Sequence, residues 1–103
     1  NPYLALAVML KAGLDGVKKR IQPPPPQNRN LYHMTSEERE MLGVETLPGS
    51  LWDALQELDR DPVIQEALGD HIYHRFREAK IIEWNAYRTQ VHPWELEQYL
   101  QVF

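Results

Sequence analysis

The first 21 residues carry a pattern of apolar positions that predicts a helix buried on more than one side. Residues 3–10 (YLALAVML) are apolar around the whole helical circumference, which is typical of a helix surrounded by other structure. Asn1 and Pro2 suit the N-cap and the first position of a helix. Further along, the apolar positions narrow to a stripe at helical spacing: Leu10, Leu14, Val17 and Ile21. We therefore expect a buried helix over residues 1–21.

Two glycines lie inside this expected helix. Gly13 and Gly16 each cost about 1 kcal/mol relative to alanine in a helix interior. A glycine has no Cβ atom and lets a second backbone segment come close. The pair therefore predicts a close neighbour on that side of the helix.

Residues 22–34 predict an exposed linker. Four consecutive prolines at positions 23–26 cannot continue a helix and favour a stiff polyproline segment. Arg20, Pro23 and Pro26 also match the RxxPxxP pattern that SH3 grooves bind. A rigid surface linker is the simpler interpretation.

Helix-start and helix-stop residues divide residues 35–88 into a helical bundle. Thr35 and Glu38 form the pattern of a capping box, and Gly43 suits the end of the helix that follows. Ser50 suits the N-cap of the next helix. The first of these expected helices begins at residue 35 and stops at residue 43. The others span residues 51–58, 62–68 and 70–88. No strand pattern of real length appears, so the segment is expected to be all-α, with about five to six helices and the proline-rich linker.

The helix expected over residues 70–88 contains one carboxylate in an otherwise apolar arc. The arc consists of Ile72, Tyr73, Phe76, Ala79, Ile82, Trp84, Ala86 and Tyr87. Glu83 lies near its middle, where an unpaired buried charge would cost several kcal/mol. We expect a structural ion pair with Lys or Arg, and a substrate or regulatory role is the alternative. Ile81 lies on the opposite side and predicts contact with a second surface.

Residues 89–103 predict a short aromatic tail. Pro93 suits the first position of a last helix, and His92 suits its N-cap. The tail carries three large aromatic side chains: Trp94, Tyr99 and Phe103.

Composition excludes several classes of protein. The chain has 103 residues, 43% of them hydrophobic, which is enough for a modest core and too many for a disordered segment. A net charge of −4 argues against nucleic acid as a partner, and no apolar run reaches the length that spans a membrane. The absence of cysteine suits a reducing compartment, so we expect a cytoplasmic protein. There is no signal-peptide pattern and no initiator Met, which suggests a piece of a longer protein.

The residues alone indicate no catalytic centre. His71, His74 and Glu78 share a helix face at a spacing that metal sites use, but they lie on the polar side, where a solvated face is the better interpretation. Asp59 and Asp61 lie near a helix start, where carboxylates interact favourably with the helix dipole. Glycine-rich phosphate loops and known hydrolase motifs are absent from the sequence.

Three stretches together resemble one enzyme family. They are NPYLALAVMLKAGLDGVKKRI (1–21), NLYHMTSEERE (30–40) and EAKIIEWNAYRTQVHPWELEQYL (78–100). In this order they are similar to the end of type I glutamine synthetases of bacteria and archaea. The resemblance implies the helical C-terminal part of an α+β catalytic domain, in an enzyme that joins glutamate and ammonia through γ-glutamyl phosphate.

The same resemblance implies the cofactors and partners of the whole enzyme. These are ATP, Mg²⁺ or Mn²⁺, the other subunits of a homo-dodecamer of two hexameric rings, and nitrogen-regulatory proteins. The family's metal ligands and phosphate-binding residues lie upstream of this stretch. We therefore expect no catalytic, cofactor-binding or metal residues in this segment, and no activity from it alone.

Two features carry over from the family residue by residue. Tyr32 aligns with a tyrosine that some members carry adenylylated, although residues 33–36 differ from the family's Asp-Leu-Pro-Pro. The sequence is more similar to the branch that is controlled by feedback and by regulatory proteins. Residues 91–103 match the tail that crosses to a subunit of the opposite ring. The expected tail contacts are Val91, His92, Trp94, Tyr99 and Phe103.

One alternative remains open at this point. A stand-alone helical module related to the ligase, which binds a partner through its tail, would carry the same patterns. The coding sequence upstream of Asn1 would distinguish the two.

Overall fold

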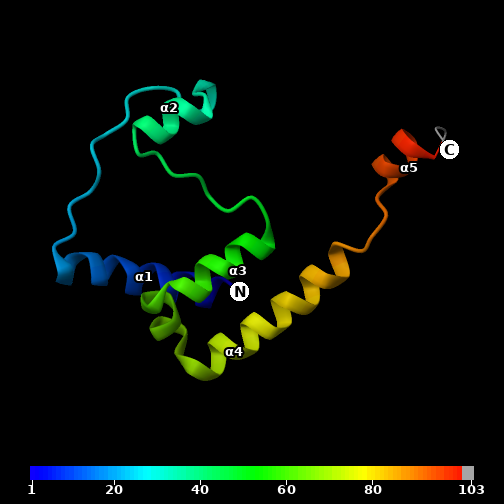
Figure 1. Ribbon diagram of the computed structural model, residues 1–103. Coiled ribbons are helices and arrows are strands. Elements are labelled where there is room, and N and C mark those ends of the chain that lie inside the picture. The colour runs from blue at the N-terminus through cyan, green and yellow to red at the C-terminus, as the bar shows by residue number, and fades with distance from the viewer. Residues whose placement is uncertain (101–103) are drawn as a thin grey trace.

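The computed structural model describes residues 1–100, and this part of the chain is all-α, as predicted. It contains five α-helices, one short 3₁₀ helix and no strand (Figure 1). In chain order the elements are α1 (Pro2–Lys19), η1 (Leu31–His33), α2 (Ser36–Met41), α3 (Leu51–Arg60), α4 (Pro62–Tyr87) and α5 (Pro93–Tyr99).

Side-chain caps define where the helices begin. The Asn1 side chain accepts hydrogen bonds from two backbone amides of the first turn of α1. Thr35 and Glu38 form the predicted capping box, with N–O distances of 3.2 and 2.9 Å. Ser50 caps α3 and Asp61 caps α4. Each cap satisfies amides that have no partner within the helix, so these starts are fixed by local sequence.

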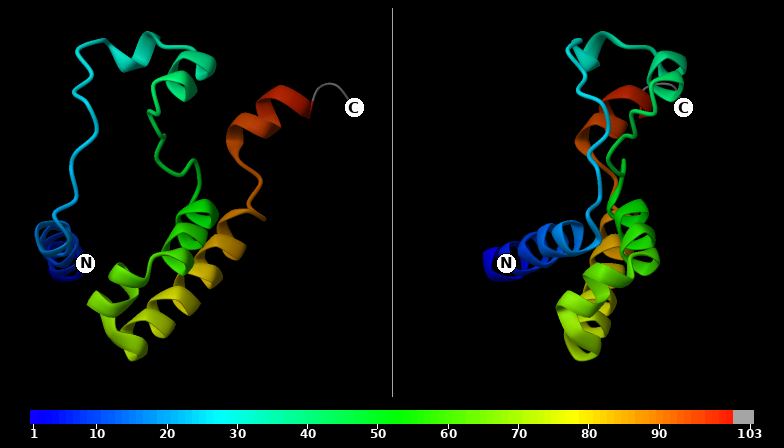
Figure 2. Two further views of the ribbon diagram at one scale, coloured as in Figure 1. Left: turned by 60° about the vertical axis from the view of Figure 1, so that its left-hand side comes forward. Right: turned by 90° about the vertical axis from the view of Figure 1, so that its left-hand side faces the viewer.

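Gly69 interrupts α4 as the sequence predicts. Its φ of 70° and ψ of 155° are not helical, and only glycine adopts this combination readily. The first two turns of α4 therefore meet the remaining helix at a kink, which Figure 2 shows at the lower end of the α3–α4 pair.

The arrangement of the helices is open. Helix α4 packs against α1 and α3, whereas α2 stands apart on two long connections and α5 lies beyond the far end of α4 (Figures 1 and 2). The radius of gyration is 18.6 Å, against about 13 Å for a compact domain of this length. Among the described residues the buried apolar side chains are Met34 and Leu55. The segment therefore has almost no core of its own.

Helix α1 is exposed, and the expectation that it is buried all round is not met within this chain. Tyr3, Leu6, Met9 and Leu10 expose between 65% and 82% of their surface. The expected close neighbour of the two glycines is missing too, because no atom outside the local helix lies within 4 Å of a Cβ built at either one. The reason is architectural: α4 packs on α1 in the described segment and leaves most of the apolar surface of α1 open.

The packed side of α4 matches the predicted apolar arc only in part, at Tyr73 and Trp84, which are partly buried. Ile72, Phe76 and Ile82 are exposed, whereas Tyr73, Arg77 and Ile81 are partly buried. The prediction assumed that the most apolar arc faces the neighbouring helix. In the structure, a polar contact with α3 places Tyr73 and Arg77 on the inner side, and Ile81 lies on that side with them.

Candidate functional site

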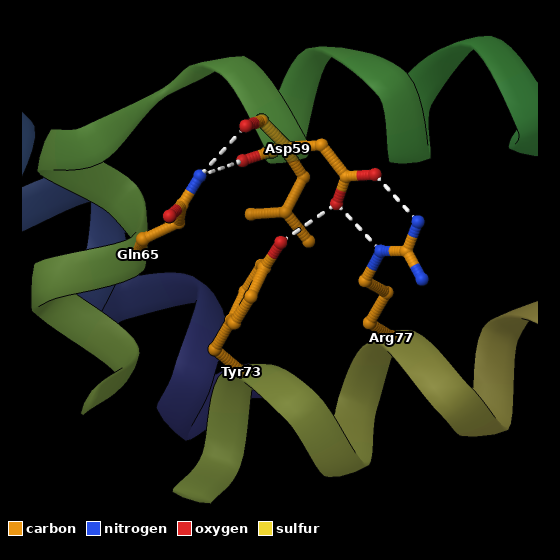
Figure 3. A network of polar contacts seen from close by, with 5 residues as sticks. Asp59, Gln65, Tyr73 and Arg77 are labelled. Carbon is orange, nitrogen blue, oxygen red and sulfur yellow. Dashed lines mark hydrogen bonds and ion pairs between the residues drawn. The ribbon is translucent and has the colours of Figure 1, made fainter. Parts of the chain in front are cut away.

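The best-defined polar cluster joins α3 to α4 through Asp59. Arg77 donates two hydrogen bonds to the Asp59 carboxylate, Nε to Oδ1 and Nη2 to Oδ2, both at 2.7 Å. The Tyr73 hydroxyl donates to Oδ1 at 2.8 Å (Figure 3). Tyr73 and Arg77 are one helical turn apart, so both side chains reach the same carboxylate. We call Asp59, Tyr73 and Arg77 the Asp59 cluster.

A neighbouring contact closes the turn between the two helices. The Gln65 side-chain amide donates to the backbone carbonyls of Leu58 and Asp59, each at 3.0 Å (Figure 3). Carbonyls at the end of a helix lack the usual partner within it. Gln65 supplies a donor to the Asp59 carbonyl and a second donor to the Leu58 carbonyl, which also accepts from the Asp61 amide at 3.3 Å. The end of α3 is thus tied to both parts of α4.

The electrostatics of the cluster favour its charged form. The hydrogen bond from Arg77 lowers the pKa of Asp59 below its usual range, and Tyr73 adds to this effect. The hydrogen bonds to Asp59 raise the pKa of Tyr73 and the pKa of Arg77. Asp59 therefore stays ionised near neutral pH, which suits a structural anion and not a general acid.

Sequence reasoning did not find this cluster. It assigned Asp59 and Asp61 to a helix start, which is right for Asp61 as the N-cap of α4. The partners of Asp59 lie 14 and 18 positions away in the sequence. The sequence pattern that could have indicated the cluster is Tyr73 and Arg77, four residues apart on the helix after Asp59. Such a pattern is common and predicts a contact only weakly.

Glu83 is paired as predicted but is not buried. Its carboxylate forms an ion pair with Lys80 one turn earlier on α4, and the side chain remains exposed. The predicted cation is therefore present. Glu83 is not buried, because no described element covers that side of α4.

Tyr32 lies fully open to solvent. It sits in η1 with 90% of its surface exposed, and its backbone amide is held by the Asn30 side chain at 3.0 Å. The His33 ring packs edge-on against it at 5.5 Å. The Tyr32 side chain is therefore open to solvent in the described part of the chain.

The predicted tail contacts are largely exposed. Val91, Trp94 and Tyr99 are exposed, and the Trp94 and Tyr99 rings meet edge-on at 6.0 Å. His92 precedes α5, where its backbone amide donates to Glu95 at 3.0 Å. Phe103 lies outside the described residues. Helix α5 thus presents aromatic side chains that the described part of the chain does not cover.

Comparison with known proteins identifies the family. Residues 1–99 match the family described as glutamine synthetase, catalytic domain. The chain belongs to the glutamine synthetase family. It is 53% identical over all 103 residues to a glutamine synthetase of Thermus thermophilus, and 50% identical to one of Staphylococcus aureus strain MW2. It covers 23% of the length of each of these relatives.

The candidate metal ligands of α4 are not grouped into a metal site in the described part of the chain. Within residues 1–100, no three His, Asp or Glu side chains are grouped so that they could hold an ion. His71, His74 and Glu78 do not converge on a site, and Glu78 instead pairs with Arg75 at 3.2 Å. No helix in the described range is both long and apolar enough to cross a membrane.

Proposed function

We propose that this chain is the C-terminal helical part of the catalytic domain of a glutamine synthetase. The whole enzyme would join glutamate and ammonia with ATP through γ-glutamyl phosphate. The observation that carries the proposal is the family match over residues 1–99, at about one half identity to full-length glutamine synthetases.

The first role we assign to the segment is that of a scaffold. Helix α1 exposes a continuous apolar surface, and exposed apolar patches of this kind are usually covered in the native assembly. We propose that catalytic strands from the rest of the domain cover residues 3–10. The relatives are more than four times as long as this chain, which leaves ample structure to do so.

The second role is contact between subunits. Aromatic residues are enriched at the centres of protein interfaces, and α5 exposes Trp94 and Tyr99. We propose that residues 91–103 reach a subunit of the opposite ring in a cytoplasmic homo-dodecamer. Nitrogen-regulatory proteins are further proposed partners, and membranes and nucleic acid are not.

The chemistry is assigned to residues outside this chain. ATP and Mg²⁺ or Mn²⁺ would be held there. The 103-residue chain alone should then form no glutamine from glutamate, ammonia and ATP, whereas the full-length protein should. Turnover by the purified chain would contradict the scaffold assignment.

The tail is tested in the full-length enzyme by deletion of residues 91–103. We expect analytical ultracentrifugation to show a shift from the double ring to single rings or smaller species. The control is Glu97→Gln, which changes one exposed charge on α5 and removes no aromatic side chain. An unchanged sedimentation coefficient for the deletion variant would refute the role in ring pairing.

A further inference from the structure

Beyond its kink, α4 is joined to α3 by one cluster of side-chain hydrogen bonds. The non-helical Gly69 breaks the backbone hydrogen bonding that would otherwise fix the two parts of α4 in line. Beyond Gly69, the side-chain hydrogen bonds from α4 to α3 in the described part of the chain all end on Asp59. They come from Tyr73 and Arg77. The Asp59 cluster, together with the packing of α4 against α3, therefore sets the direction in which the long part of α4 leaves α3.

The far end of α4 is coupled to α5. The Thr89 hydroxyl donates to the carbonyls of Asn85 and Ala86 at 3.2 and 3.0 Å. The Gln90 side chain donates to the Ala86 carbonyl at 3.1 Å. The Tyr87 and His92 rings lie 5.2 Å apart. The hydrogen bonds hold the start of the connector against the last turn of α4, and the ring contact keeps His92, the residue before α5, next to Tyr87.

Because the Asp59 cluster lies far from the end of α4, a small tilt of the helix at the cluster moves that end by several ångströms. Arg77 lies ten residues before the last residue of α4, Tyr87, or about 15 Å along the axis at ~1.5 Å per residue. A tilt of roughly 10° at the cluster displaces that end by about 3 Å over such a length. Close-packed interfaces do not absorb shifts of this size.

We propose that Asp59, Tyr73 and Arg77 are positioning residues for subunit assembly, because they aim α4 so that α5 reaches its site on the neighbouring subunit. The inference rests on the proposed role of the tail in ring pairing. The cluster makes no hydrogen bond to residues 91–100 of the tail and acts through the direction of α4.

The geometry of the pair favours positioning over simple attraction. Arg77 meets Asp59 through two parallel hydrogen bonds, which fix orientation as well as distance. A lysine would keep the charge but present a single flexible donor. The other ion pairs of α4 that stay within the helix, such as Arg75 with Glu78, restrain no second element.

The experiment uses the full-length enzyme with Arg77→Lys and, as a matched control, Arg75→Lys. Both changes keep the charge and replace an arginine on the same helix. We expect Arg77→Lys to raise the fraction of dissociated rings at a fixed low protein concentration at least threefold, measured by analytical ultracentrifugation. Arg75→Lys should leave that fraction unchanged. Far-UV circular dichroism and the KM for glutamate should be the same in both variants.

A second pair of variants separates positioning from loss of fold. Asp59→Asn keeps the size of the side chain and should weaken assembly like Arg77→Lys. The double variant Asp59→Arg with Arg77→Asp restores the ion pair in reverse and should recover assembly at least in part. Wild-type assembly of both single variants would overturn the inference, and so would a loss of helix content that parallels the loss of assembly.

The deletion of residues 91–103 is measured beside these variants. If the deletion leaves the double ring intact, the proposed role of the tail is wrong and the inference falls with it. If the deletion dissociates the rings and Arg77→Lys does not, the inference alone is wrong.

Discussion

Asp59 shows how one carboxylate can join two helices at a partly exposed position. It accepts two hydrogen bonds from Arg77 and one from Tyr73, so its charge is balanced and its oxygens are largely satisfied. Solvent still reaches both members of the ion pair. Pairs of this kind contribute no more than about 1 kcal/mol to stability. Their value lies in geometry, because the guanidinium fork donates both hydrogen bonds to the carboxylate in one relative orientation.

The lowered pKa of Asp59 predicts the pH dependence of this contact. A carboxyl whose pKa is lower in the folded state stabilises that state above its usual pKa, and this contribution is lost as the pH falls through the folded pKa. Asp59→Asn should therefore lower the urea midpoint of the 103-residue chain at neutral pH, followed by circular dichroism at 222 nm. At a pH below the lowered pKa of Asp59, the midpoints of the two proteins should converge.

Glu97→Gln serves as the control for this titration, since Glu97 is exposed and lies on α5, away from α3. It should leave the midpoint unchanged at both pH values. If the urea midpoints of wild type and Asp59→Asn differ by the same amount in acid, the charge of Asp59 is not what stabilises the contact.

At the scale of single residues, the helix-capping residues were predictable from the sequence, whereas the Asp59 cluster was not. Thr35 and Glu38 are three residues apart, so one short motif contains both partners of each hydrogen bond. The partners of Asp59 come from the next helix, and their approach depends on the kink at Gly69. Glu83 illustrates the same limit, because its cation was predictable from the helix and its exposure was not.

At the scale of elements, the sequence predicted helix existence better than helix environment. The starts at Ser50 and Asp61 and the break at Gly69 follow from caps and from glycine, which act locally. The packed side of α4 does not follow from local rules. Periodicity identifies the most apolar arc, and which arc is covered depends on neighbouring structure that the pattern does not contain.

The two glycine environments predict opposite effects of one substitution. Gly69→Ala should destabilise the 103-residue chain by about 1–3 kcal/mol, because alanine rarely adopts a positive φ with an extended ψ. Gly13→Ala should stabilise α1 by about 1 kcal/mol, because Gly13 lies inside a helix. Steric contact plays no part in either case, since nothing lies within 4 Å of the added carbon.

Urea unfolding followed at 222 nm measures both glycine variants, and each serves as the control for the other. Equal effects of the same sign would contradict the assignment of a special backbone conformation to Gly69. In the full-length enzyme, Gly13→Ala is expected to lose its benefit if catalytic strands pack closely there.

At the scale of the molecule, the chain is a set of well-formed helices without a shared core. A radius of gyration of 18.6 Å and two buried apolar side chains among the described residues are unlike an independent domain of this length. The hydrophobic content of the chain does not predict this open arrangement, because it is that of an ordinary globular protein. The family resemblance explained the mismatch, because it implied a much larger domain around these helices.

The apolar surface of α1 should respond oppositely in the isolated chain and in the whole enzyme. Leu6→Glu with Met9→Glu places two charges on a surface that is open here, so the 103-residue chain should self-associate less, as measured by light scattering. In the full-length enzyme the same change should lower the thermal inactivation temperature, because an unpaired charge buried under catalytic strands costs roughly 2 kcal/mol or more. Gln22→Glu, in the exposed linker, should alter neither property. A full-length double variant as stable as wild type would mean that nothing covers α1 in the enzyme, and the scaffold role proposed for it would have to be abandoned.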